Sequence, residues 1–212
     1  TIDFRPYPKG VAPSTPVRPA RAVSPSFDTV GLFSGGLDSL VGAIDALEGD
    51  DVPLFVSHAG EGATSDAQNG CFEALKVHYK KRPVDRLRVW MSFPKTLVRG
   101  VDPENTTRAR SFLFLALGVF AGTGLAQAFT LRVPENGFIA INVPLDVLRL
   151  GSLSTRTTHP FYMARWSQLL TALGIPCRIE NPYWKLTKGE IVARCANSEL
   201  LCRLIPKSLS CS

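Results

Sequence analysis

Short apolar runs alternate with amphipathic segments along most of the chain, which is the pattern of an α/β protein. The apolar runs predict five strands, over Thr29–Phe33, Pro53–Ser57, Arg86–Met91, Ala128–Val133 and Cys177–Ile179. Apolar residues at helical spacing predict helices that begin at Leu37 and near Thr107 and that cover Asp66–Lys80, Pro160–Leu173 and Leu186–Cys195. Because strands and helices alternate, we expect a parallel sheet with helices on both faces.

Two stretches depart from this alternation. Residues 1–26 carry six of the sixteen prolines and four basic residues, so we expect an extended arm there and one domain over 27–212. The stretch from Pro134 to Pro160 is rich in hydrogen-bonding side chains and is too long for an ordinary connection. Loops of this length are usually functional.

The composition is that of a globular protein, with 45% apolar and 20% charged residues and a net charge of +6. Ser111–Phe129 is apolar and about long enough to span a bilayer, but its α/β surroundings favour a helix buried against the sheet. The five cysteines include no Cys-x-x-Cys pair, and the first residues do not form a signal peptide. We therefore expect a cytoplasmic protein without a membrane partner.

A turn rich in glycine and serine joins the first predicted strand to the first helix: Ser34-Gly35-Gly36-Leu37-Asp38-Ser39. Adjacent glycines permit a sharp turn and close approach of a ligand, and the helix directs its free N–H groups to the same space. The serines add hydroxyl groups, and Asp38 adds a carboxylate for Mg²⁺. The motif therefore predicts a phosphate site with a metal ligand.

This loop is neither a Walker A motif, because no lysine follows the glycines, nor the dinucleotide fingerprint. It resembles the pyrophosphate loop of the N-type ATP pyrophosphatases. The resemblance implies an adenine nucleotide alpha hydrolase-like, Rossmann-like fold that binds ATP and Mg²⁺, cleaves ATP between the α and β phosphates and transfers AMP to an acceptor oxygen. It also implies that His58, just after the second predicted strand, contacts the adenosine, although a loop histidine without a role is an equal alternative.

Three basic residues lie where helices are predicted to begin. Arg108 and Arg110 lie at the start of the long apolar helix, and Lys188 follows Thr187, which with Glu190 forms a predicted capping box. A cation at a helix N-terminus opposes the helix dipole unless it faces an anion. We expect these side chains to neutralise the departing pyrophosphate, with solvated surface residues as the alternative.

The polar stretch supplies candidate substrate ligands. Glu135 and Asn136 are suited to the amino and ring N–H edge of a guanine-like base, and Arg156 to a carboxylate. Thr157 and His159 are suited to positioning the acceptor. The alternative is a polar loop that stabilises itself through turns and caps.

The chain from about residue 28 to residue 212 resembles 7-cyano-7-deazaguanine synthase, the ligase of queuosine precursor synthesis. The shared features are the Ser34–Ser39 loop, Lys188-Gly189-Glu190-Ile191-Val192 and Ser210-Cys211. Where the family usually has Pro-Gly-Arg-Asn, this chain has Thr107–Arg110. The polar segments 134–137 and 154–160 are similar to a divergent branch of the family that is found in bacterial antiviral-defence gene clusters. The resemblance implies a homodimer that adenylates 7-carboxy-7-deazaguanine, with ammonia or an amine of a partner protein as the final acceptor.

In that family a serine-cysteine pair opens a zinc site that three later cysteines complete. Cys211 is therefore a candidate Zn²⁺ ligand, and the remaining ligands are not in this sequence. We expect either a missing C-terminal zinc segment or no zinc site.

Two other functions stay open. The net charge and basic arm fit a tRNA-modifying pyrophosphatase, although the polar blocks lack the reactive cysteine of a thiolase, and nucleic acid is not the expected partner. The second alternative is a non-catalytic nucleotide-binding subunit.

Overall fold

A computed structural model describes residues 27–59, 62–91, 110–125, 127–141 and 158–209. Five parallel strands form one sheet in the order β3-β2-β1-β4-β5. The strands are β1 (Thr29–Leu32), β2 (Pro53–His58), β3 (Asp85–Val89), β4 (Phe129–Arg132) and β5 (Cys177–Glu180). The predicted Rossmann-like α/β fold is confirmed.

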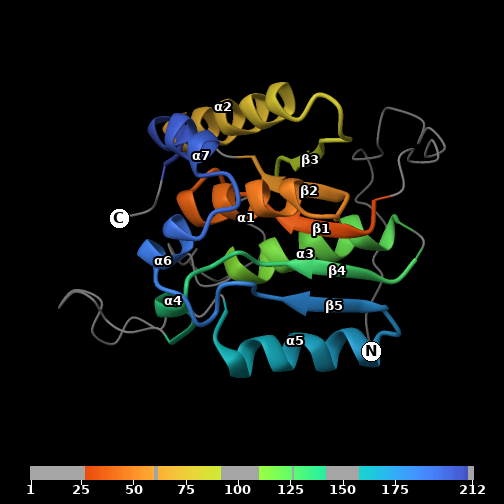
Figure 1. Cartoon of the computed structure of the whole chain (residues 1–212). Helices are drawn as coiled ribbons and strands as arrows, with labels where there is room; N and C mark the ends of the chain where they lie inside the picture. Colours follow the sequence, from red (N-terminus) through yellow and green to blue (C-terminus); the bar gives the residue numbers. More distant parts are fainter. Residues whose placement is uncertain (1–26, 60–61, 92–109, 126, 142–157, 210–212) are drawn as a thin grey trace, which may run out of the picture.

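Helices cover both faces of the sheet (Figure 1). One face carries α1 (Leu37–Glu48), α2 (Gly62–His78), α6 (Lys188–Ala193), α7 (Ser198–Leu204) and the 3₁₀ turn η2 (Ile205–Lys207). The other carries α3 (Arg110–Thr123) and α5 (Pro160–Ala172), and the short α4 (Gly137–Ile141) follows β4. Each face has its own apolar cluster, so the sheet is buried on both sides, as its parallel strands require.

Helix α3 packs unusually close to the sheet. Its Gly118 and Gly122 leave room for side chains of β4, and a Cβ at Gly122 would overlap the ring of Phe129. Glycines in the apolar stretch therefore serve packing against the sheet, in agreement with the predicted buried helix. Within the described residues, no helix is long and apolar enough to cross a bilayer.

The element boundaries differ from the predicted ones where caps and turns decide them. Helix α2 begins at Gly62, four residues before the predicted start at Asp66, and α3 ends at Thr123, before the sequence pattern becomes strand-like. The stretch after Pro134, predicted to be irregular, contains α4. Helix α7 and η2, which follow the last predicted helix, were not predicted at all.

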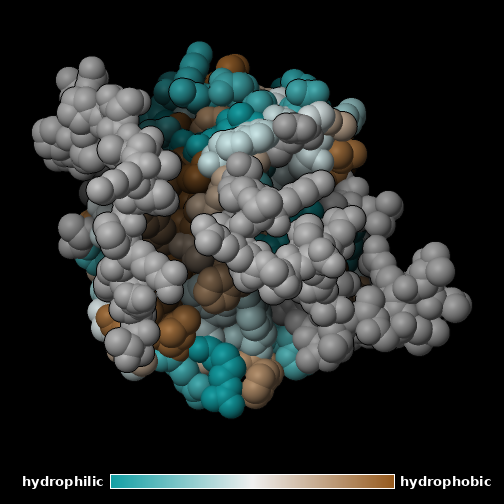
Figure 2. Space-filling view, turned by 180° about the vertical axis from the view of Figure 1, so that it is seen from behind, coloured by the Kyte–Doolittle hydropathy of each residue, from teal (hydrophilic) through white to brown (hydrophobic). Residues whose placement is uncertain are grey.

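All strands point the same way, so their carboxyl ends meet at one edge of the sheet. In Figure 1 the arrowheads of β1, β4 and β5 point toward the side where α4 and α6 lie. The chain reverses its direction of winding between β1 and β4, and ligands of such folds bind at the carboxyl ends of strands beside this point. Viewed from behind, hydrophobic residues gather in the middle of the molecule, with hydrophilic residues above and below them (Figure 2).

Candidate nucleotide site

The Ser34–Ser39 loop joins β1 to α1 at the carboxyl edge of the sheet. Its two hydroxyl groups lie 3.1 Å apart, and the Ser39 hydroxyl donates a hydrogen bond to the Gly36 carbonyl at 2.9 Å. The backbone N–H groups of Ser34 and Gly36 each donate to a serine hydroxyl at 3.3 Å. These long bonds hold the loop together at the start of α1 and engage two of its backbone N–H groups internally, so phosphate binding by the loop stays a prediction.

Gly35 is required by both conformation and space. Its φ is +82°, and a Cβ at this position would lie 2.6 Å from the Cα of Gln68 on α2. Any larger residue would strain the backbone and displace the loop from α2.

The end of the described chain also contacts this loop. The backbone N–H of Leu209 donates to the Gly35 carbonyl at 3.1 Å. The Leu209 carbonyl lies 3.4 Å from where a Cβ at Gly36 would be placed. The segment after η2 therefore runs against the glycines of the loop.

Asp38 is almost fully buried in the first turn of α1 and connects three parts of the site. Its Oδ2 accepts hydrogen bonds from the backbone N–H and the side-chain amide of Asn136, at 3.1 and 2.6 Å. Its Oδ1 lies 3.6 Å from the ammonium group of Lys188, whose side chain is 45% exposed. Among the described residues this buried Oδ1 accepts no hydrogen bond and has Lys188 as its opposite charge, so the assignment of Asp38 as a Mg²⁺ ligand stays a prediction.

The Asn136 side chain is engaged within the protein at both ends. While its amide donates to Asp38, its Oδ1 accepts from the backbone N–H of Phe138 at 3.1 Å, at the start of α4. This geometry gives Asn136 a structural contact in place of the free amide that reading a base would need. Its role as a substrate ligand stays a prediction.

Lys188 is placed by the capping box that the sequence predicts. The Thr187 hydroxyl accepts from the Glu190 N–H at 3.3 Å, and the Glu190 carboxylate accepts from the Thr187 N–H at 2.8 Å. The preceding segment is held to α4, because the Gly137 N–H donates to the Leu186 carbonyl at 2.7 Å. Helix α6 therefore begins with Lys188 directed at Asp38.

The carboxyl group of Glu135 has a raised pKa. Burial, and then the negative charge of Asp38, raise its pKa to about 7, and Lys188 opposes part of this rise. Its backbone N–H donates to Asn181 Oδ1 at 3.5 Å. A carboxyl group with this pKa exchanges protons readily at neutral pH.

His58 and Arg110 lie at the neighbouring carboxyl end, beyond β2. The His58 Nε2 is 3.2 Å from the Met91 carbonyl oxygen, and its ring centroid is 5.9 Å from that of Phe114 on α3. The Arg110 guanidinium lies over the same Phe114 ring, 5.3 Å from its centroid. Phe114 thus connects the two residues in space, and both lie on the β2 side of the phosphate loop.

The other predicted site residues fall in two groups. His159 is the N-cap of α5, where its Nδ1 accepts from the Phe161 N–H at 3.2 Å. The remaining predicted residues lie outside the described ones: Arg108, Arg156, Thr157 and Cys211. Within the described ranges, no group of three His, Cys, Asp or Glu side chains is arranged to hold a metal ion.

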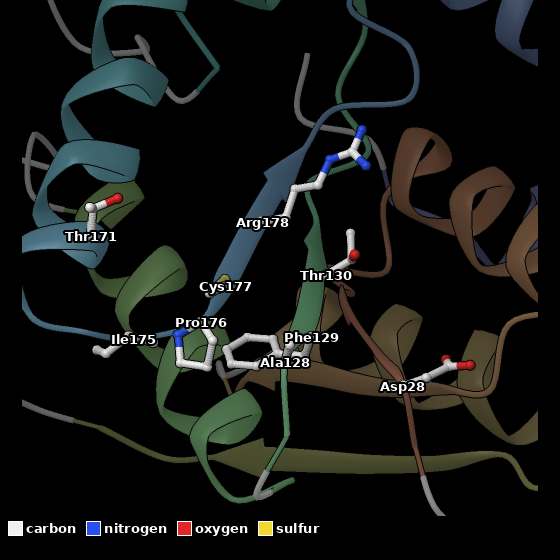
Figure 3. A pocket seen from close by; sticks show the side chains of 9 residues that line it. All are labelled: Asp28, Ala128, Phe129, Thr130, Thr171, Ile175, Pro176, Cys177 and Arg178. Atoms are coloured by element: carbon white, nitrogen blue, oxygen red, sulfur yellow. The ribbon is translucent and has the colours of Figure 1, made fainter.

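A pocket elsewhere on the molecule is separate from these residues. It lies near the amino ends of β4 and β5, and Asp28, Phe129, Thr171 and Arg178 are among its lining residues (Figure 3). This is the edge opposite the Ser34–Ser39 loop, where parallel α/β folds rarely bind their substrates.

Two residues that contact the Ser34–Ser39 loop were not predicted from the sequence. Gln68 is only 3% exposed, although its spacing to Cys71, Phe72 and Leu75 already placed it on the buried face of α2. A polar residue on the predicted buried face of a helix signals a side chain with specific hydrogen-bond partners. No local signal pointed to Leu209, whose contact joins distant parts of the chain.

No family model matches the chain, and no curated protein is significantly similar to it. The features that point to a function are the Ser34–Ser39 loop, its position at the reversal of winding and the side chains that converge on Asp38.

Proposed function

We propose that this chain is an ATP pyrophosphatase that adenylates a carboxylate and passes the acyl group to an amine. The observation that carries the proposal is the Ser34–Ser39 loop, which lies at the carboxyl end of β1 beside Asp38 and Lys188. The proposed acid is 7-carboxy-7-deazaguanine, by resemblance of the motifs. The final acceptor is ammonia or an amine of a partner protein.

The first step places ATP with its β and γ phosphates on the loop. A carboxylate oxygen of the acid attacks the α phosphorus, and the bond to the bridging oxygen breaks, so pyrophosphate leaves with that electron pair. Lys188, which pairs with Asp38, and Arg110, at the start of α3, would supply positive charge to the leaving group. Mg²⁺, when bound at Asp38 Oδ1, would neutralise further phosphate charge.

The second step joins the amine to the acyl carbon and releases AMP. The attacking nitrogen must lose a proton, and Glu135, with a pKa of about 7, is suited to accept it. This assignment uses Glu135 as a base in place of the base-reading role that the sequence suggests.

The direct test is ATP–pyrophosphate exchange with labelled pyrophosphate in the presence of 7-carboxy-7-deazaguanine. We expect exchange that depends on both the acid and Mg²⁺. Exchange without the acid, or stimulated by tRNA, would favour a tRNA-modifying enzyme. Binding of ATP without exchange in a chain that includes any zinc-binding segment would favour a non-catalytic subunit.

A further inference from the structure

We infer that Gln68 is a positioning residue that fixes the phosphate loop relative to the edge of the sheet beyond β2. The inference rests on the proposed function, because it concerns how one nucleotide is held by two neighbouring strand ends. The observation is a single buried amide that contacts the ends of both β1 and β2.

The side-chain amide of Gln68 faces three backbone carbonyl groups. Its Nε2 is 3.5 Å from the carbonyl oxygens of Phe33 and Ser34, and 3.3 Å from that of His58. The first two oxygens belong to residues at the start of the Ser34–Ser39 loop, and the third belongs to His58, which is predicted to contact adenosine. One NH₂ group therefore bridges the two halves of the proposed ATP site.

The orientation of this amide is fixed from the opposite side. Its Oε1 accepts from Arg88 Nε at 3.2 Å, and the Arg88 guanidinium also donates to the Ser65 hydroxyl at 2.6 Å. Because arginine only donates, the amide oxygen must face Arg88 and the NH₂ group must face the carbonyls. Arg88 lies on β3, so three adjacent strands contribute to this arrangement.

The backbone of Gln68 is part of the same support. Its carbonyl accepts from Arg86 at 3.2 Å, and its Cα limits how closely any residue at position 35 can approach α2. The backbone of α2 thus limits how closely Gly35 approaches that helix, while the Gln68 side chain fixes the distance between the ends of β1 and β2. Burial makes these contacts stronger than the same contacts at the surface.

The test uses Gln68→Met, which keeps the side-chain length and removes both hydrogen-bonding functions. Binding of ATP and of pyrophosphate alone is measured by calorimetry on the whole chain. ATP spans both strand ends, whereas pyrophosphate needs only the loop. We expect the variant to bind ATP about 10-fold more weakly and pyrophosphate within about 2-fold of the wild type.

Two further variants keep the inference testable if Gln68→Met folds poorly. Arg88→Met leaves Gln68 in place but frees its amide to rotate, so we expect a smaller loss of ATP affinity, about 3-fold, with pyrophosphate unchanged. Tyr79→Phe removes a side-chain hydrogen bond just after the end of α2, the one to Glu48, and should leave both affinities unchanged.

The outcomes separate this inference from the proposed function. A wild-type chain that binds neither ATP nor pyrophosphate contradicts the proposed function itself. A wild-type chain that binds ATP, with Gln68→Met and Arg88→Met binding it equally well, overturns the role of Gln68. Equal loss of ATP and pyrophosphate affinity also overturns it, because Gln68 would then support only the loop.

Discussion

The two oxygens of the Asp38 carboxylate have different surroundings. Oδ2 receives two hydrogen bonds from Asn136, whereas Oδ1 lies near the Lys188 ammonium and accepts no hydrogen bond from the described part of the chain. A single residue therefore holds the turn after β4 through one oxygen and pairs with Lys188 through the other.

Replacing Asp38 by Asn tests this combination. The variant loses the negative charge opposite Lys188, so we expect the rate of ATP–pyrophosphate exchange to fall about 100-fold or more. Asp45→Asn is the control on the same helix, because Asp45 bonds to Tyr183 and Ala196 away from the loop. Equal losses of exchange in both variants would show that general damage to α1 explains the effect.

Glu135 predicts a pH dependence of stability. Its pKa is raised to about 7 in the folded chain, so the folded state holds this proton more tightly than the unfolded state. The contribution is therefore favourable below pH 4.5 and is lost as the pH rises through 7. Since Glu135 keeps some solvent exposure, we expect the loss to be about 1–2 kcal/mol.

Urea unfolding of the wild type and Glu135→Gln at pH 5 and pH 8 measures this loss. The variant cannot titrate, so it should gain stability relative to the wild type as the pH rises. Glu199→Gln, on an exposed side chain of α7, is the control and should follow the wild type. Parallel pH profiles for the wild type and Glu135→Gln would contradict the assigned pKa.

At the scale of elements, α6 is a short helix whose start matters more than its length. It has six residues, too few to be stable alone, and its capping box aligns Lys188 with Asp38. Helix α7 has a comparable cap at Asn197, which accepts from the Leu200 N–H and donates to Glu48. The two helices therefore form a matched pair for a substitution test.

We expect Thr187→Ala and Asn197→Ala each to lower the free energy of unfolding by about 1 kcal/mol, a drop in melting temperature of roughly 2–4 °C. Only Thr187→Ala should also lower ATP–pyrophosphate exchange, because only that cap positions Lys188. Calorimetric melting and exchange assays on both variants check the two effects. Loss of exchange in Asn197→Ala, with normal exchange in Thr187→Ala, would contradict the role assigned to the Thr187 cap.

At the scale of the whole molecule, the fold was predictable because strands and helices alternate with clear periods. The strand–turn–helix junction at Ser34–Ser39 and the Thr187 capping box were predictable for a related reason, since both are local signals. The contacts among Asp38, Asn136 and Lys188 were not predictable, because they bring together three segments far apart in the chain. Helix α7 was missed because its seven residues are too short for a helical period to stand out.

The whole chain should gain stability from ATP if the proposed site exists. A ligand that binds only the folded state at 100 times its Kd adds about 2.7 kcal/mol, which raises the melting temperature by roughly 5–10 °C. We expect this shift with MgATP and a smaller one with MgGTP, measured by scanning calorimetry. Asp38→Asn should show little shift, and an equal shift for both nucleotides would contradict recognition of adenosine.

The bond between Leu209 and Gly35 has a consequence for the order of folding during synthesis. The phosphate loop is made early by the ribosome, but the backbone group that holds its first glycine is made near the end of the described chain. This hydrogen bond can form only after η2 and Leu209 have emerged from the ribosome. A nascent chain stalled before that point would contain all five strands but lack this contact, so we expect it to bind nucleotide more weakly than the longer chain if the proposed function holds.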